Sequence, residues 1–128
     1  MARMFLTALQ VAVGGAIGAT LRWALGIGLL RTFGPTSFPL PVLTANVVGS
    51  AAMGAFVVLA AQRGLSQMSP FMMTGFLGGF TTFSAFSLET VTLIERGQVG
   101  TAALYVTASV VLCVGGLWLG VVGTRAAL

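Results

Sequence analysis

Apolar residues occupy four long stretches of the chain, and short segments rich in polar and turn-forming residues separate them. The stretches cover about residues 4–30, 40–61, 70–94 and 99–123. Each is long enough to cross the hydrocarbon core of a bilayer, which takes about 20 apolar residues in a helix. The pattern predicts an all-α membrane protein with four transmembrane helices and a single domain, residues 1–128.

Composition supports the membrane assignment and excludes several classes of function. Of 128 residues, 57% are hydrophobic and only 6% are charged, whereas about 25% of the residues of a soluble domain are charged. All positive charges are single arginines, so no basic patch for nucleic acid exists. With no histidine and one cysteine, Cys113, neither a zinc site nor a disulfide framework is expected. No nucleophile–base pair stands out, and we expect no enzyme activity.

The arginines also predict how the chain inserts. Four spans place both termini and the second connection on one side, and orientation follows the Lys/Arg bias of short loops. One side then holds Arg3, Arg63 and Arg125, and the other holds Arg31 and Arg96, with Arg22 near its end of the first span. The counts nearly cancel, which is typical of a dual-topology protein that assembles as an antiparallel dimer. The same counts also fit a weakly biased protein with one orientation.

The third stretch contains "GGFTTFSAFSLET", residues 78–90, where small and polar residues interrupt an apolar helix. The Gly78-Gly79 pair followed by Thr81-Thr82 predicts a helix break near the middle of the span, because these residue types weaken helices. Backbone groups freed at such breaks form ion sites in transporters and channels. The alternative is an unbroken helix whose Ser and Thr hydroxyls bond to the preceding turn.

Phenylalanines surround this predicted break. Phe83 and Phe86 are three residues apart and share one helix face. Rings in a membrane helix usually face lipid or fill the core, and we assign Phe76 to packing. A ring edge carries partial positive charge, however, so two rings presented edge-on attract an anion without a formal cation.

Polar side chains within the second and fourth stretches indicate a hydrated path. Asn46 is costly in lipid unless its amide bonds to another helix, and its NH₂ group can donate to an anion. Thr101, Tyr105 and Ser109 repeat at a spacing of four on the last helix. Such a stripe alone fits hydrogen bonding between helices. Together with Asn46, Thr44 and the hydroxyls of the third span, a wet path is the better interpretation.

Glu89 is the one acidic residue expected within a span, and an acid at membrane depth is a functional candidate. Its position near a helix end also allows it to reach water or to pair with Arg22. Hydroxyl and amide groups serve cations through oxygen and anions through hydrogen. The residues alone therefore predict a small polar conduit and leave the sign of its ion open.

Small residues repeat at a spacing of four along three of the stretches. The pairs are Gly14 with Gly18, Gly15 with Ala19, Ser50 with Gly54, and Gly116 with Gly120. Such pairs let helix backbones approach closely in lipid, so we assign them to packing.

Three motifs and the four-span layout together resemble the Fluc/CrcB family of fluoride channels. The motifs are "GGAIGATLRW" at 14–23, "LTANVVGS" at 43–50 and "GFLGGFTTFSAFSLET" at 75–90. The likeness covers nearly the whole chain, and the glycine–threonine–phenylalanine motif is highly specific. The resemblance implies a fluoride-selective channel of the cell's inner (plasma) membrane that exports fluoride passively. It also implies an antiparallel, dual-topology homodimer with two pores.

The resemblance further assigns individual residues. It implies a structural Na⁺ at the dimer axis, bound by the main-chain carbonyls of Gly78 and Thr81 from both subunits. The residues matched to the fluoride path are Asn46, Phe83, Phe86, Ser84, Tyr105, Ser109, Glu89 and, near the vestibule, Arg22. Many members carry a threonine where this chain has Ala85. The series of polar groups along this path, the polar track, is therefore one hydroxyl shorter here, or another group or a water takes the place of that hydroxyl.

Two other classes of membrane protein fit a short four-span chain. A small multidrug resistance antiporter needs an acidic residue in its first span, whereas the only charged residue within that span here is Arg22. A noncatalytic assembly subunit of a larger membrane complex explains the packing glycines but not the polar third and fourth spans.

Overall fold

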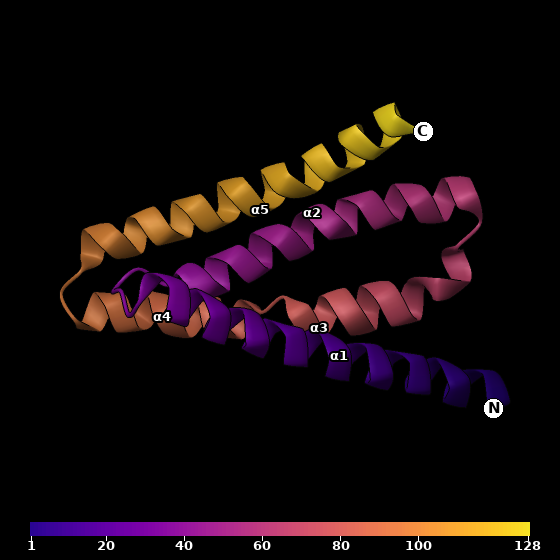
Figure 1. The fold of residues 1–128 in the computed structure, drawn as a ribbon, viewed down its shortest axis with the longest axis horizontal. Coiled ribbons are helices and arrows are strands. Elements are labelled where there is room, and N and C mark those ends of the chain that lie inside the picture. The colour runs from indigo at the N-terminus through magenta and orange to yellow at the C-terminus, as the bar shows by residue number, and fades with distance from the viewer.

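The computed structural model describes all residues from Met1 to Leu128, and every regular element in it is helical (Figure 1). The third span is built from several pieces, whereas the other spans are single helices. The elements are α1 (Ala2–Phe33), α2 (Leu40–Arg63), the 3₁₀ turn η1 (Ser66–Met68), the π-helical η2 (Pro70–Leu77), α3 (Gly78–Phe80), α4 (Phe83–Glu95) and α5 (Val99–Ala127).

Four segments are long and apolar enough to cross a membrane, and they confirm the four spans predicted from the sequence. The segments are Ala2–Phe33, Leu40–Arg63, Ser66–Glu95 and Val99–Ala127. Both termini and the α2–η1 connection lie at one end of the molecule, and the other two connections lie at the opposite end (Figure 1). The chain is therefore a multi-pass membrane protein whose ends emerge on the same side.

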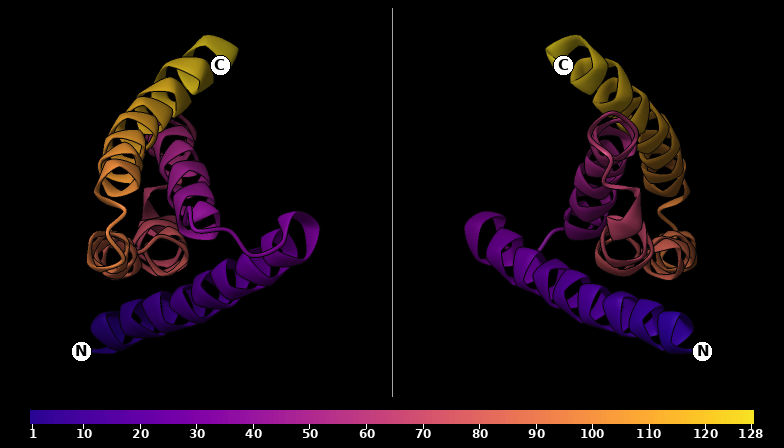
Figure 2. Two further views of the ribbon diagram at one scale, coloured as in Figure 1. Left: turned by 90° about the vertical axis from the view of Figure 1, so that its left-hand side faces the viewer. Right: turned by 90° about the vertical axis from the view of Figure 1, so that its right-hand side faces the viewer.

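The third span lies between α1 and a pair formed by α2 and α5. α2 packs along α5, while α1 packs along η2 and α3, and α4 lies against α5 (Figure 2). Large apolar side chains remain exposed along α1 and α5, as expected for a surface that faces lipid. Only 16 of 128 residues are buried, and Gly14, Gly18 and Gly54 are among them, so close backbone packing contributes to the contact between helices.

Prolines and a glycine set the ends of α2. Pro39 precedes the helix and Pro41 lies in its first turn, where a missing N–H costs no helical hydrogen bond. Gly64 ends the helix in the left-handed conformation, with φ 66° and ψ 36°. The residues that separate apolar stretches in the sequence therefore turn the chain between spans.

Buried glycines join neighbouring helices at the level of the backbone. Gly14 and Gly18 are the buried residues of α1, and a Cβ at Gly18 would collide with the carbonyl oxygen of Phe76. Between α2 and α5, a Cβ at Gly54 would collide with the carbonyl oxygen of Leu117. The packing role predicted for these glycines is confirmed.

Gly18→Ala is expected to destabilise the fold. Overpacking a core costs roughly 1–3 kcal/mol, and the cost here should be at least as large because backbone atoms cannot rotate away from the new methyl group. Gly28→Ala is the matched control, since it lies on the same helix and a Cβ there meets nothing within 4 Å. Alanine also favours the helix over glycine. Thermal unfolding in detergent, followed by circular dichroism, measures both variants. Equal melting temperatures for the two would contradict the packing described above.

Candidate functional site

The third span leaves the helical conformation at two residues between α3 and α4. Thr81 has φ −94° and ψ 157°, and Thr82 has φ −153° and ψ 119°, so both are extended. Gly78 and Gly79 are helical members of α3, so of the four residues on which the break was predicted only Thr81 and Thr82 depart from the helix. Gly79 instead serves close packing, because a Cβ there would lie 2.7 Å from the carbonyl oxygen of Gly15.

Asn46 holds the extended backbone of Thr82 with both ends of its amide. Its Nδ2 donates to the carbonyl oxygen of Thr82 at 3.1 Å, and its Oδ1 accepts from the N–H of Thr82 at 2.8 Å. These bonds join α2 to the third span and satisfy main-chain groups that lipid cannot satisfy. An amide NH₂ carries two hydrogens, so one donor of Asn46 is left for a further acceptor.

Thr82 also starts the next helix. Its Oγ1 accepts from the N–H of Ala85 at 3.1 Å, which caps α4, and lies 3.2 Å from Oγ of Ser84. A threonine cap stabilises a helix by about 1 kcal/mol. Thr81 behaves differently, because its Oγ1 donates to the carbonyl oxygen of Leu77 in the preceding turn at 2.9 Å.

The interruption separates carbonyl oxygens from their usual helical donors, among them those of Gly78 and Thr81. In a continuous helix the N–H of Thr82 donates to Gly78 and the N–H of Ala85 donates to Thr81. Here these two N–H groups donate to Asn46 and to the side chain of Thr82. Carbonyl oxygens are ligands that hard cations prefer. The main chain at Gly78 and Thr81 therefore fits the cation site that the family resemblance implies.

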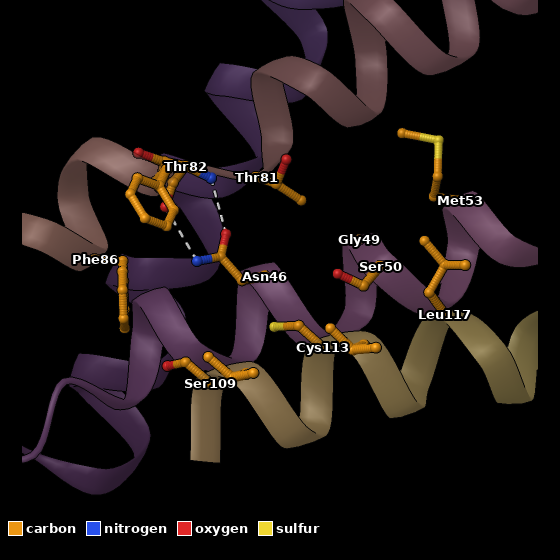
Figure 3. A pocket seen from close by; sticks show the side chains of 13 residues that line it. Asn46, Gly49, Ser50, Met53, Thr81, Thr82, Phe86, Ser109, Cys113 and Leu117 are labelled. Carbon is orange, nitrogen blue, oxygen red and sulfur yellow. Dashed lines mark hydrogen bonds between the residues drawn. The ribbon is translucent and has the colours of Figure 1, made fainter. Parts of the chain in front are cut away.

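A cavity of about 350 Å³ lies beside the interruption, between α2, α4 and α5 (Figure 3). Asn46 points across it from α2 toward Thr82, and Phe86 and Ser109 lie at the same end. No charged side chain lines the cavity. Its wall includes Asn46, Ser50, Phe83, Phe86, Ser109 and Cys113.

Aromatic rings lead from this cavity into the core. The exposed ring of Phe83, at 78% exposure, lies 5.4 Å from that of Phe86 between centroids. The ring of Phe86 lies 5.2 Å from Tyr105, which in turn meets Phe38 edge-on at 5.7 Å. The four rings form one contiguous series that spans the α1–α2 connection, α4 and α5.

Two hydroxyl groups next to these rings are buried without a hydrogen-bond partner within the chain. Tyr105 is fully buried and Ser109 is 7% exposed, and neither Oη of the tyrosine nor Oγ of the serine is paired. A buried hydroxyl without a partner costs a few kcal/mol, roughly. These hydroxyls are therefore free to bind a polar ligand.

The remaining residues assigned from the sequence lie around the cavity and not in its wall. Glu89 borders a second cavity of about 230 Å³, with Arg96 and the α1–α2 connection. Arg22 donates from Nε to the carbonyl oxygen of Gly79 at 3.3 Å. Ser84 reaches the site only through the hydroxyl of Thr82. Glu89 and Arg22 are thus not brought together.

Some lining residues carried no signal in the sequence. Cys113 and Met53 line the main cavity, yet each stands within an apolar run, where packing is the usual role of such residues. Phe38 contacts Tyr105 from a connection that the sequence marks only as turn-rich. These residues reach the site through contacts between segments that are far apart in the sequence, and a local sequence pattern does not reveal such contacts.

Fold and site together define a small four-helix membrane protein with an uncharged cavity of polar and aromatic groups. Residues 9–121 match the family described as CrcB-like protein, Camphor Resistance (CrcB). The chain belongs to this family, in agreement with the resemblance of its motifs.

Curated relatives of high identity bear the name Fluoride-specific ion channel FluC. The relative from Ruegeria sp. (strain TM1040) is 60% identical over 125 residues, covering 98% of this chain and 99% of the relative. That of Roseobacter denitrificans is 66% identical over 111 residues, covering 86% and 88%. That of Cereibacter sphaeroides (strain ATCC 17029 / ATH 2.4.9) is 53% identical over 122 residues, covering 95% and 97%.

Proposed function

We propose that this protein is a fluoride-selective ion channel of the inner membrane, and not an enzyme, through which cytoplasmic fluoride leaves the cell passively. The name of its relatives supports both the ion and the channel class. For this chain, the observation that carries the proposal is the cavity beside Thr82, whose wall combines an amide, hydroxyls and aromatic rings without a charged side chain.

These groups suit fluoride, which is small and strongly hydrated. A conducting path must replace the water of the ion, yet bind weakly enough to release it. The free N–H of Asn46 and the ring edges of Phe83 and Phe86 supply short-range positive charge, and no fixed cation is present to trap the ion. Beyond the rings, the unpaired hydroxyls of Ser109 and Tyr105 receive the ion next.

Three further residues support this path from outside the main cavity. Arg22 fixes α3 through the carbonyl oxygen of Gly79, and Ser84 lies against the hydroxyl of Thr82. Glu89, in the second cavity, stands at the far end of the polar track. With Ala85 in place of a threonine, the hydroxyl of Thr82 lies close to that position, since it accepts from the N–H of Ala85, and the hydroxyl of Ser84 lies beside it.

The functional unit in this proposal is an antiparallel homodimer with two paths. Nearly balanced arginines support insertion in both directions. The largely exposed ring of Phe83 supports a site that a second subunit completes.

Labelling of single cysteines is expected to show both orientations in comparable amounts. Ser37→Cys and Ser66→Cys, each in a Cys113→Ser background, place a thiol at opposite ends of the molecule without altering the arginine count. Both serines are exposed, and each cysteine should react with an impermeant reagent from either side of the membrane. Reaction of each site from one side only would refute dual topology.

We also propose that a structural Na⁺ binds at the dimer axis, through the carbonyls of Gly78 and Thr81 from both subunits. The loss of their regular helical donors supports this assignment. Replacing Na⁺ with a large organic cation should then lower the thermal stability of the dimer. Fluoride flux should proceed without sodium flux, and measured sodium co-transport would refute a structural role.

Growth in fluoride tests the export direction. Undissociated HF crosses membranes and releases fluoride in a near-neutral cytoplasm, and an inside-negative potential drives the anion outward by about 2.3 kcal/mol per charge per 100 mV. Expression in a bacterium that lacks its own fluoride exporter should restore growth and lower cytoplasmic fluoride. Accumulation equal to that with an empty vector, despite membrane-inserted protein, would contradict the proposal.

A further inference from the structure

The cavity beside Thr82 contains a thiol that the proposed fluoride path does not use. Cys113 is the single cysteine of the chain, is partly exposed, and lines the cavity from α5 near Ser50 of α2 (Figure 3). Ser109, four residues earlier on α5, lines the same cavity with a buried hydroxyl that has no partner. The thiol therefore shares the cavity with the hydroxyl of Ser109, whose hydrogen-bonding capacity is unused.

We propose that Cys113 is a modification site, at which a small neutral thiol reagent closes the fluoride path. The inference rests on the proposed function, because it takes the path to pass Ser109. Residues four apart on a helix share one face and differ by about 6 Å along the axis. An adduct on Cys113 therefore occupies the space beside the hydroxyl of Ser109.

The cavity itself selects the kind of reagent. Its volume of about 350 Å³ accommodates a small organic group, and such a group on Cys113 excludes the ion and its water from the space beside Ser109. The walls carry no charged side chain, so a neutral reagent of low polarity is favoured over a charged one, whose desolvation is costly. The chemical class is a small neutral electrophile that transfers a sulfenyl group.

An alkyl methanethiosulfonate supplies this chemistry without another reactant. The sulfur of Cys113 attacks the sulfenyl sulfur, the disulfide bond to the alkylthio group forms, and the sulfur–sulfur bond of the reagent breaks. Methanesulfinate leaves with the electron pair, and the thiol proton passes to water. A thiol reductant reverses the modification by exchange at the new disulfide.

The test compares methyl and benzyl methanethiosulfonate on the wild-type protein in liposomes, with mass spectrometry of the protein and fluoride efflux of the same sample. The benzyl adduct should lower efflux by about tenfold or more and the methyl adduct by less, because the larger group fills more of the cavity beside Ser109. Dithiothreitol should restore the initial rate. Cys113→Ser should gain no mass and be insensitive to both reagents.

A matched control separates the cavity from the rest of the helix. Val111 is 61% exposed and lies half a turn away from Ser109 and Cys113. Val111→Cys in a Cys113→Ser background should gain the benzyl adduct and keep its efflux rate. An unmodified Cys113 in folded protein, full efflux after complete modification, or equal block at position 111 would each overturn the inference. No fluoride efflux from untreated wild-type protein would instead refute the proposed function.

Discussion

Asn46→Asp is expected to lower fluoride flux by at least a hundredfold. The substitution keeps the shape of the side chain and the acceptor for the N–H of Thr82, but it removes the donor to the carbonyl oxygen of Thr82. It also places a negative charge beside the path. Two like charges 4 Å apart repel by about 4 kcal/mol at the effective dielectric constant typical near a protein surface, and about 1.4 kcal/mol is a tenfold effect.

Flux through Asn46→Asp is measured with purified protein in liposomes, and folding by circular dichroism and size exclusion. Thr20→Val is the control, because the hydroxyl of Thr20 is exposed and bonds only within α1, to the carbonyl oxygen of Ala16 at 2.6 Å. This variant should retain both fold and flux. If the Asn46→Asp dimer folds and conducts at the wild-type rate, Asn46 does not belong to the fluoride path.

Phe83→Ile and Phe86→Ile are each expected to cut fluoride flux far more than they cut stability. Isoleucine fills a comparable apolar volume, and such swaps usually cost less than about 1.5 kcal/mol, but it has no electropositive edge. Phe83 is 78% exposed and should lose little stability. Phe86 also contacts Tyr105, so its replacement should cost a further 0.5–1.5 kcal/mol, roughly.

Phe76→Ile provides the comparison for the two ring variants. Phe76 does not line the main cavity, and its backbone packs against Gly14 and Gly18. Fluoride efflux and thermal stability should be measured for all three variants in parallel. Equal losses of flux at the three positions, in step with loss of folded dimer, would mean that the rings only fill space.

The spans of this protein are predictable from sequence because the bilayer fixes the length of each apolar helix. The first stretch, expected at about residues 4–30, corresponds to α1 at Ala2–Phe33, and the fourth, expected at about 99–123, to α5 at Val99–Ala127. The helices continue a few residues past the expected stretches, because hydropathy gives no sharp limit at a helix end. Glycine pairs at a spacing of four likewise identified the packed faces of α1.

The detail of the third span is not predictable in the same way. Helix propensity points to Gly78 and Gly79, yet contact with Gly15 keeps Gly79 in a helix, and tertiary packing overrides propensity. The extended residues come later, where Asn46 reaches Thr82 from 36 positions away in the chain. A polar residue in a span shows that a partner is needed but not which one.

The composition of the cavity is also a tertiary property. Asn46 and Ser109 could be named from the sequence because polar groups at membrane depth are costly, and Phe83 and Phe86 could be named because their motif matches the family. Cys113 could not be, since an apolar residue of this kind fits any helix interior. The separation of Glu89 from the main cavity depends on how α4 and the α1–α2 connection pack.

Fluoride efflux from liposomes that contain the purified wild-type protein tests the proposed function most directly. Liposomes loaded with potassium fluoride or potassium chloride are diluted into halide-free buffer with a potassium ionophore, and ion-selective electrodes record release. Rapid loss of fluoride, with chloride retained as in protein-free liposomes, is the expected result. Release of chloride at the same rate, or retention of fluoride by liposomes that hold folded dimer, would contradict a fluoride-selective channel.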